Sequence, residues 1–229
     1  MIHAALDTSA GFTLAILDDD RLLLKDALRS AGRDSDRMLL PWLMGHLESL
    51  NLKPADVRAW SAGIGPGSFA GLRCGIAVIK GIATVTGARL RGVPSSCAIA
   101  AAAAASQPEA SDIVALHDGR CGQVIAVYME KDAAGAWHIT REPAPVFPEE
   151  LEISEGRIWA TMQPEALPEL PEAVAAKLVL PEAMDAAALA NAPAEKYPWP
   201  ENTADQESST TPLYVRQAVF VKPAAIKGV

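Results

Sequence analysis

The stretch from Gly63 to Gly81, GIGPGSFAGLRCGIAVIKG, constrains the fold of this 229-residue chain more than any other. Glycine permits positive φ and close backbone approach, so Gly65-Pro66-Gly67 is predicted to form a tight turn. Ser68 is the expected N-cap of a helix, because its side-chain oxygen can accept a hydrogen bond from a free amide of the first turn. Apolar residues then recur at helical spacing on two sides of residues 69–87, which predicts a helix held between layers or between subunits.

Three interpretations of this glycine-rich stretch compete. A Walker A loop needs Gly-Lys-Ser/Thr after its second glycine, and that is absent. A dinucleotide fingerprint needs a third glycine in register, where Ala70 stands instead. Spacing alone therefore favours a turn that leads into a buried helix.

The rest of the chain predicts an α/β fold with mixed sheets flanked by helices. Up to residue 105 the elements follow the order β-β-β-α-β-α-β-α. Apolar runs and helical periodicity predict strands over 2–6, 11–17, 21–27, 57–64 and 90–93, and helices over 36–50, 69–87 and after Pro94. The second part is predicted to have strands over 113–116, 122–129 and 137–140, a helix over 181–190, a loop over 198–211 and a final strand or edge segment over 214–221.

A short pattern occurs twice, as Leu6-Asp7-Thr8 and as His117-Asp118-Gly119, each between predicted strands. A duplicated two-lobe fold would produce such a repeat, and chance would produce it about as readily.

Composition limits what the chain can bind by itself. The formal net charge is −8, whereas a protein that grips nucleic acid alone normally carries a basic face. The chain shows no signal peptide, and we find no apolar run of the roughly 18 residues that a membrane span needs. Three unevenly spaced cysteines imply neither a disulfide framework nor a zinc site and are expected in or near the core. We expect a cytoplasmic protein with no membrane contact.

Four segments, in order, resemble the TsaB (YeaZ) family. GPGSFAGLR resembles the family signature, usually written GPGSFTGLR, with Ala70 at the threonine position. The other segments are LDTS at 6–9, DGR at 118–120 and PLYVR at 212–216. The resemblance is strong over residues 1–130 and faint over 140–205. Ser35-Asp36 stand where relatives often have His-Ser.

The resemblance implies a fold and a function. The family has the two-lobe actin-like fold (ASKHA, ribonuclease H-like), which places an N-terminal lobe at 1–105 and a C-terminal lobe at 106–229, with the terminal segment packing back on the first lobe. The implied function is that of a non-catalytic subunit in tRNA N6-threonylcarbamoyladenosine synthesis. It would dock on the catalytic paralogue TsaD and help recruit TsaE, with TsaC upstream, meet tRNA only within that complex, and form a homodimer when alone.

The helices predicted over 36–50 and 69–87 have more apolar surface than one sheet contact covers, which is typical of a partner surface. The resemblance places the TsaD interface on the same helices. The expected contact residues are Leu39, Leu43, His46, Leu47, Gly71, Leu72, Gly75, Ile76 and Ile79.

The principal alternative is an ATP-binding phospho- or acyltransferase of the same fold. Polar and glycine residues resemble its phosphate loops in a vestigial form: Asp7, Thr8, Ser9, Gly65, Gly67, Ser68, Arg73, Asp118 and Arg120. After residue 141, however, glycine occurs only at Gly156 and Gly228, and nucleotide pockets normally use glycine for close approach. We therefore expect no cofactor beyond weak nucleotide binding at the seam with a partner.

Two further alternatives rank lower. A metallopeptidase-like protein would need a His-x-x-x-His pair, but His3, His46, His117 and His138 are not so spaced, so no metal site is expected. Ser68 lies outside a G-x-S-x-G motif, so no catalytic residue is assigned. A bare dimerisation module is the remaining possibility.

Overall fold

The first of two sheets carries the glycine-rich stretch. The computed structural model describes residues 1–28 and 35–215. The strand order is β3-β2-β1-β4-β5. Strands β1 to β3 form an antiparallel meander, and β4 and β5 continue the sheet parallel to β1, so the predicted mixed sheet is confirmed. The strands are β1 (Ile2–Asp7), β2 (Phe12–Asp18), β3 (Arg21–Leu28), β4 (Ala59–Gly63) and β5 (Arg89–Val93).

The second sheet repeats the pairing pattern of the first. Its order is β11-β10-β6-β7-β8, with β9 also paired to β7. The β6–β7 hairpin is antiparallel, and β10 and β11 add parallel to β6, as β4 and β5 add to β1. This matching order favours duplication over chance for the repeated Asp-containing turn. The strands are β6 (Asp112–Asp118), β7 (Val124–Lys131), β8 (Trp137–Ile139), β9 (Ala144–Val146), β10 (Ile158–Ala160) and β11 (Leu178–Val179).

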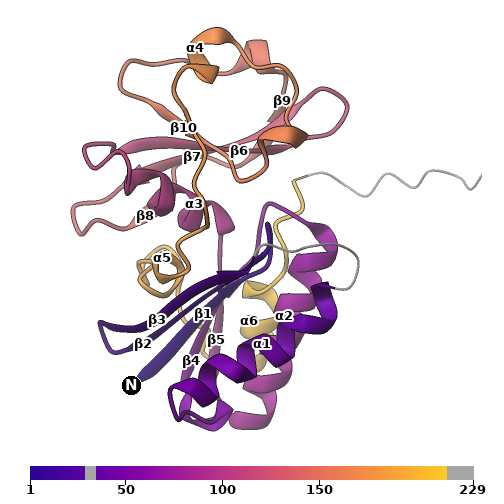
Figure 1. Ribbon diagram of the computed structural model, residues 1–229, viewed down its shortest axis with the longest axis vertical. Helices are drawn as coiled ribbons and strands as arrows, with labels where there is room; N and C mark the ends of the chain where they lie inside the picture. Colours follow the sequence, from indigo (N-terminus) through magenta and orange to yellow (C-terminus); the bar gives the residue numbers. More distant parts are fainter. Residues whose placement is uncertain (29–34, 216–229) are drawn as a thin grey trace, which may run out of the picture.

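Helices cover and separate the sheets (Figure 1). Helices α1 (Ser35–Ser49) and α2 (Phe69–Thr86) lie together on the outer face of the first sheet, while α3 (Ser95–Ala104) and α5 (Ala187–Ala190) lie between the sheets. Helix α4 (Glu172–Ala175) lies at the far end of the second sheet, and α6 (Thr203–Ser209) contacts β5. Short 3-10 turns occur at Pro54–Asp56, Pro148–Glu150 and Pro164–Ala166.

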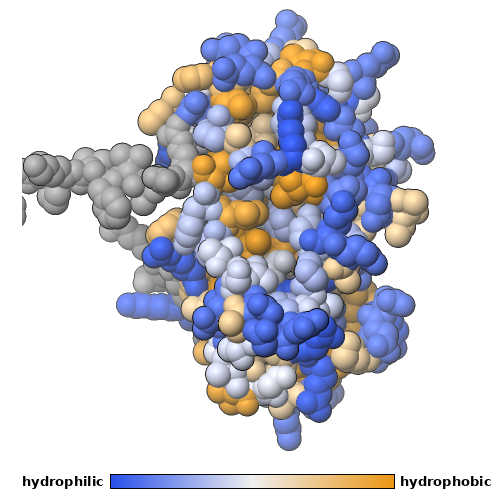
Figure 2. Space-filling view, turned by 180° about the vertical axis from the view of Figure 1, so that it is seen from behind, coloured by the Kyte–Doolittle hydropathy of each residue, from blue (hydrophilic) through white to orange (hydrophobic). Residues whose placement is uncertain are grey.

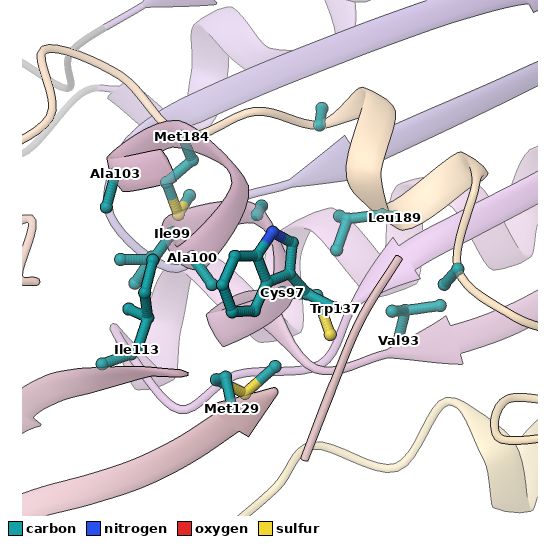
Figure 3. Packing of buried hydrophobic residues seen from close by; sticks show 14 of the residues in the cluster. Val93, Cys97, Ile99, Ala100, Ala103, Ile113, Met129, Trp137, Met184 and Leu189 are labelled. Atoms are coloured by element: carbon teal, nitrogen blue, oxygen red, sulfur yellow. The ribbon is translucent and has the colours of Figure 1, made fainter. Parts of the chain in front are cut away.

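The largest core cluster joins the two sheets through the alanine-rich α3. Ala98, Ala100 and Ala103 are fully buried, and their small side chains let this helix fit between two sheets. Figure 3 shows Trp137 and Met129 facing this helix, with Met184 and Leu189 closing the cluster from the segment that contains α5. Side chains from both halves of the chain thus form one continuous core.

The region after residue 141 departs most from expectation. The predicted helix over 181–190 is reduced to α5, and the predicted loop over 198–211 contains α6. Asn202 begins α6 as an N-cap, its side chain accepting a hydrogen bond from the Asp205 amide at 3.0 Å, a signal that the loop interpretation missed. Residues 216–221 of the predicted final strand lie outside the described residues, as do residues 29–34.

Helix α2 is more apolar than the sequence analysis implied when it found no run long enough for a membrane span. Its 18 residues, Phe69–Thr86, are long and apolar enough to pass a length-and-composition test for a membrane span, and within the described residues it is the one helix that does. A single such helix is weak evidence for a span, because core helices pass the same test. Only 28% of its residues are buried, so much of an apolar helix faces outward.

Figure 2 shows another face of the molecule, on which hydrophobic side chains gather near the middle of a mainly hydrophilic surface.

Candidate functional site

The predicted start of α2 is confirmed. The Ser68 side chain accepts a hydrogen bond from the Gly71 amide at 3.2 Å, and Gly87 ends the helix in the left-handed conformation. The preceding turn contains a cis Gly65–Pro66 peptide bond. Local sequence thus determines where this helix begins and ends.

The glycine-rich loop lies directly against the β1–β2 turn of the same chain. The Ser68 amide donates to the Ser9 carbonyl at 2.7 Å, and the Thr8 hydroxyl donates to the Gly71 carbonyl at 2.8 Å. A Cβ atom added at Gly75 would overlap the Thr8 side chain, and one added at Gly71 would overlap the Thr8 carbonyl. The close approach that Gly71 and Gly75 were expected to give a partner helix is therefore used within this chain.

Asp7 lies at the end of β1 and is fully buried. Its Oδ1 accepts a hydrogen bond from the Ser9 amide at 2.7 Å. Its Oδ2 fills the space that a Gly63 side chain would occupy, and within the described residues no donor reaches that oxygen with hydrogen-bond geometry. Burial raises the pKa of the Asp7 carboxyl, and interactions with Ser9 and the nearby Ser95 hydroxyl partly oppose that rise. The Ser95 hydroxyl lies near Asp7 but does not form a hydrogen bond with Oδ2.

The raised pKa of Asp7 predicts a pH-dependent gain in stability for Asp7→Asn. Because the pKa in the folded protein exceeds its unfolded value, the favourable contribution of Asp7 is complete below the unfolded pKa, about 3.9, and is lost as pH rises through the folded pKa. We expect Asp7→Asn to be more stable than the parent by about 1–3 kcal/mol at pH 8, with the gain shrinking towards pH 4. Urea unfolding from pH 4 to pH 8 measures it.

A matched control separates burial from loss of charge. Asp20 lies exposed in the β2–β3 turn, and Asp20→Asn should change the free energy of unfolding by less than about 0.5 kcal/mol. A loss of stability for Asp7→Asn at pH 8 would contradict the interpretation, since it would mean that the ionised carboxylate is well stabilised.

The second predicted loop satisfies its own polar groups. Asp118 Oδ1 accepts a hydrogen bond from the Arg120 amide at 2.7 Å, and Oδ2 lies 3.1 Å from Arg120 Nε. The Arg120 side chain is otherwise exposed to solvent. The Asp118 carboxylate is therefore engaged by its own turn.

Little space remains between the two lobes where the hairpins approach each other. The cavity there, about 10 Å³ in volume, is lined on one side by Ser9 and Gly67 and on the other by His117, Thr161 and Gln163. Ligand pockets typically measure about 300–1,000 Å³, and about 10–15 Å³ is needed for one water molecule. This cavity therefore has no room for a nucleotide.

A histidine–serine contact beside this cavity was not foreseen. His117 Nε2 lies 3.0 Å from the Ser96 hydroxyl, which joins β6 to the start of α3. Burial lowers the pKa of His117 to about 4, so the imidazole is neutral at neutral pH. In the sequence, His117 directly follows the apolar run 113–116, and this position was the signal that could have drawn attention to it. In the described part of the chain, no group of three His, Cys, Asp or Glu residues could hold a metal ion.

The sequence did not predict that the arginine on β5 is buried. Arg91, on β5, is 2% exposed and donates from Nε to the Ser61 hydroxyl at 3.0 Å. Its terminal nitrogens donate to the carbonyls of Tyr197, Leu189 and Ala190. Burial, with a smaller effect of the neighbouring Arg89, lowers the pKa of Arg91 to about 10. These bonds fix α5 and the segment after it against the first sheet.

Aromatic and histidine side chains complete this cluster. His3 Nε2 lies 3.1 Å from the same Ser61 hydroxyl, and burial, followed by the charge of Arg91, lowers its pKa to about 4. The Trp199 ring lies 4.4 Å from the Arg91 guanidinium carbon and 4.9 Å from that of Arg89. The cluster therefore ties three strands, β1, β4 and β5, to the segment that contains Tyr197 and Trp199.

The partner interface expected from the sequence includes side chains that this chain buries itself. Its six leucine and isoleucine side chains are 0–6% exposed and belong to the core beneath α1 and α2. Helical periodicity marked the apolar side of each helix correctly, but the first sheet covers that side. His46 is half-buried, with Nε2 2.9 Å from Asp26 Oδ2, an ion-pair distance without hydrogen-bond geometry. The residues that move to the core are Leu39, Leu43, Leu47, Leu72, Ile76 and Ile79.

Other apolar residues of the same two helices face solvent. Met38 and Leu40 on α1 are 54% and 46% exposed, and Phe69 and Val85 on α2 are 50% and 88% exposed. Arg73 stacks over the Phe69 ring at 3.9 Å and donates to the Tyr214 hydroxyl at 3.0 Å. The surface near the start of α2 thus carries an exposed aromatic–arginine cluster.

The structure has two sheets with a repeated strand order, helices between and outside them, and an Asp-containing hairpin in each half. Together these features define a two-lobe actin-like fold. Solved structures agree. YeaZ from Pseudomonas aeruginosa has a TM-score of 0.67 at 23% identity, covering 83% of this chain and 90% of that one. A second structure, titled as an uncharacterized Pseudomonas aeruginosa protein with similarity to peptidase YEAZ, gives 0.67 at 24%, covering 83% and 88%.

Sequence comparisons show similarity to proteins of tRNA threonylcarbamoyladenosine synthesis over about half of the chain. A family model described as "TsaD: tRNA N6-adenosine threonylcarbamoyltransferase" matches residues 29–141. The Escherichia coli K12 tRNA threonylcarbamoyladenosine biosynthesis protein TsaB is 31% identical over 117 residues, which is 51% of this chain and 50% of that protein. The match thus spans about half the length of this curated relative. Over about half of its length the chain is therefore similar to the TsaB (YeaZ) family.

Proposed function

We propose that this protein is a cytoplasmic, non-catalytic subunit of tRNA N6-threonylcarbamoyladenosine synthesis that docks on a TsaD-type catalytic relative. The similarity to Escherichia coli TsaB over about half of the chain supports the pathway. The observation that carries the docking role is the outward apolar side of α2, a helix of which only 28% is buried. Exposed apolar side chains on one side of a helix, here Phe69 and Val85, are typical of protein interfaces.

The polar loops support a subunit rather than a phosphotransferase. Thr8, Ser9 and the glycine-rich loop form hydrogen bonds with one another, and Asp118 bonds within its own turn. The cavity between Ser9 and Gly67 on one side and His117 on the other measures about 10 Å³. Polar groups that already bond to each other leave few free donors for phosphate oxygens.

The docking surface that we propose replaces the buried residues by their exposed neighbours. It comprises Met38 and Leu40 on α1 with Ala77, Gly81 and Val85 on α2. The Phe69–Arg73–Tyr214 cluster extends it, and such clusters match the aromatic and arginine enrichment of interface hot spots. We propose that a second copy of the chain covers the same surface when TsaD is absent, and that TsaE joins only the assembled complex.

Co-purification with TsaD tests this surface. Val85→Glu places a charge on an 88% exposed side chain, so the fold should persist while a desolvated carboxylate weakens docking at least about 10-fold. Ala134→Glu, in the exposed β7–β8 turn, is the matched control and should leave co-purification unchanged. Undiminished binding by Val85→Glu together with Ala77→Glu would contradict the proposed surface.

Reconstituted tRNA modification tests the function itself. Modification by TsaD and its partner enzymes should fall when this chain is omitted and recover when it is added back. Calorimetry of the chain alone with Mg-ATP distinguishes a subunit from the alternative, an ATP-binding transferase. Micromolar binding with turnover would favour a transferase over a subunit.

A further inference from the structure

The described part of the chain ends at Val215, which packs against the core that joins the two sheets. Just before it, the Leu213 amide donates to the Ile64 carbonyl at 2.7 Å, and the Tyr214 ring packs on the start of α2. Figure 1 shows this segment running from α6 past the start of α2 towards the second lobe. Residues 216–229, which we call the C-terminal tail, therefore start between the lobes.

An open hollow lies on the second-lobe side of the seam. Its volume is about 400 Å³, and it lies between the β6–β7 turn, residues 118–123, and the segment Ala166–Pro168. The small seam cavity has Gly67 of the glycine-rich turn on one side and His117 and Gln163 on the other. The hollow begins one residue after His117 and three residues after Gln163. We call it the second-lobe hollow, and it adjoins the place where the C-terminal tail starts.

The C-terminal tail is long enough to enter this hollow. An extended chain advances at most about 3.6 Å per residue, so residue 220 can lie up to roughly 20 Å from Tyr214. The apolar run 219–221, Val-Phe-Val, is thus within reach of the apolar wall at Ala166–Pro168. The hollow of about 400 Å³ also has the size of a ligand pocket, for which about 300–1,000 Å³ is typical.

Charge favours the second lobe as the binding partner of the C-terminal tail. The tail contains Arg216, Lys222 and Lys227 and no carboxylate side chain. Residues 106–215, in contrast, hold 19 carboxylate side chains and six arginine or lysine side chains. Helix α2, the nearest element of the first lobe, carries two cations and no carboxylate. Opposite charge therefore directs the tail away from α2 and towards the second lobe.

The rim of the hollow stays acidic after its own ion pair is taken into account. Asp118 and Arg120 pair at 3.1 Å and leave no net charge between them. Glu165 and Glu169 lie on either side of the apolar wall and are exposed. Within residues 1–28 and 35–215, neither glutamate has a partner for an ion pair. These two carboxylates are therefore available to basic side chains of the tail.

We propose that the C-terminal tail binds in the second-lobe hollow and straps the two lobes together. The apolar run 219–221 contacts the wall at Ala166–Pro168. The basic side chains on either side of this run face Glu165 and Glu169. Because the first lobe holds the residues just before the tail, this contact bridges the seam. It leaves the α1–α2 docking surface uncovered, so its test does not depend on the proposed role in tRNA modification.

Cross-linking to a native cysteine tests the position of the tail. The Cys121 thiol is exposed in the turn that lines the hollow. In dilute full-length Phe220→Cys, a short bismaleimide should join position 220 to Cys121 within one molecule, as mapped by mass spectrometry. Binding raises the effective concentration of the two thiols, so this reaction should be at least about 10-fold faster than in Ala134→Cys. Ala134 is the control because its turn lies at the opposite end of β7.

Charge variants separate binding in the hollow from chance encounter. In the Phe220→Cys background, Glu165→Lys with Glu169→Lys should slow the cross-link at least about 5-fold. Glu109→Lys with Glu155→Lys makes the same change of charge at exposed positions before β6 and β10, at the ends of these strands away from the hollow. This control pair should leave the rate within about 2-fold.

A measurement without a cysteine at position 220 keeps the outcome decisive. Phe220→Glu should uncover the turn and speed alkylation of Cys121 at least about 5-fold over the parent protein. Cross-linking of position 220 to Cys74 on α2 or to a second copy would overturn the proposal by placing the tail elsewhere. Equal slowing by both charge pairs, or unchanged alkylation of Cys121 in Phe220→Glu, would overturn it too.

Discussion

Replacing Gly75 with alanine is expected to lower the free energy of unfolding by about 2–4 kcal/mol. The added Cβ would overlap the Thr8 hydroxyl and methyl groups. Thr8 is 3% exposed and its hydroxyl donates to the Gly71 carbonyl at 2.8 Å, so rotating the side chain away sacrifices that bond. Urea unfolding followed by circular dichroism measures the change.

Gly81 provides the matched control on the same helix. A Cβ added there meets nothing within 4 Å, and alanine favours helix by about 0.5–1 kcal/mol over glycine. We therefore expect Gly81→Ala to stabilise the protein while Gly75→Ala destabilises it. Stabilisation of similar size by both substitutions would mean that the contact of α2 with the β1–β2 turn is not close.

The contrast between these glycines shows what sequence could and could not predict. Spacing located the turn, the Ser68 cap and α2, because the signals for each lie within a few residues. It also indicated that Gly71 and Gly75 allow close approach. It could not say to what, because Thr8 is more than 60 residues away along the chain.

The burial of the leucine and isoleucine side chains expected at the interface was unpredictable for a similar reason. Periodicity separates the apolar side of a helix from its polar side, and α1 and α2 do have such sides. Which apolar residues the first sheet covers depends on how each helix is rotated against it. Leu43 is consequently fully buried while Leu40 is 46% exposed, although both belong to the same apolar pattern.

The region after residue 141 was unpredictable for a different reason. Strand β11 has two residues, and β8, β9 and β10 have three each, too few to show any periodicity. Their pairing with β6, β7 and one another maintains them. Such elements depend on tertiary contacts that local sequence does not record.

Arg91 depends most clearly on partners that are distant in the sequence. Arg91→Met is expected to lower the free energy of unfolding by about 3–5 kcal/mol. The guanidinium donates to carbonyl oxygens of Leu189, Ala190 and Tyr197, roughly 100 residues away. Methionine fills a similar volume but leaves these buried acceptors without a donor, at about 1–3 kcal/mol each. Thermal and urea unfolding measure the loss.

Hydrogen exchange locates the effect within the chain. Leu189 and Ala190 lie at the end of α5, so Arg91 satisfies carbonyls that a helix leaves unpaired. Without it, amides of the segment from α5 to α6 should exchange faster than those of β1 and β4. Arg91→Lys should fall between methionine and arginine, because a single ammonium cannot reach acceptors on several sides.

Arg89 separates the buried hydrogen bonds from stacking on Trp199. Its guanidinium carbon lies 4.9 Å from the Trp199 ring, close to the 4.4 Å of Arg91, but its side chain is exposed. Arg89→Met should therefore cost less than about 1 kcal/mol and leave exchange in the α5–α6 segment unchanged. If both arginine variants lost the same stability, stacking on Trp199 rather than the carbonyl bonds would hold this segment to the first lobe.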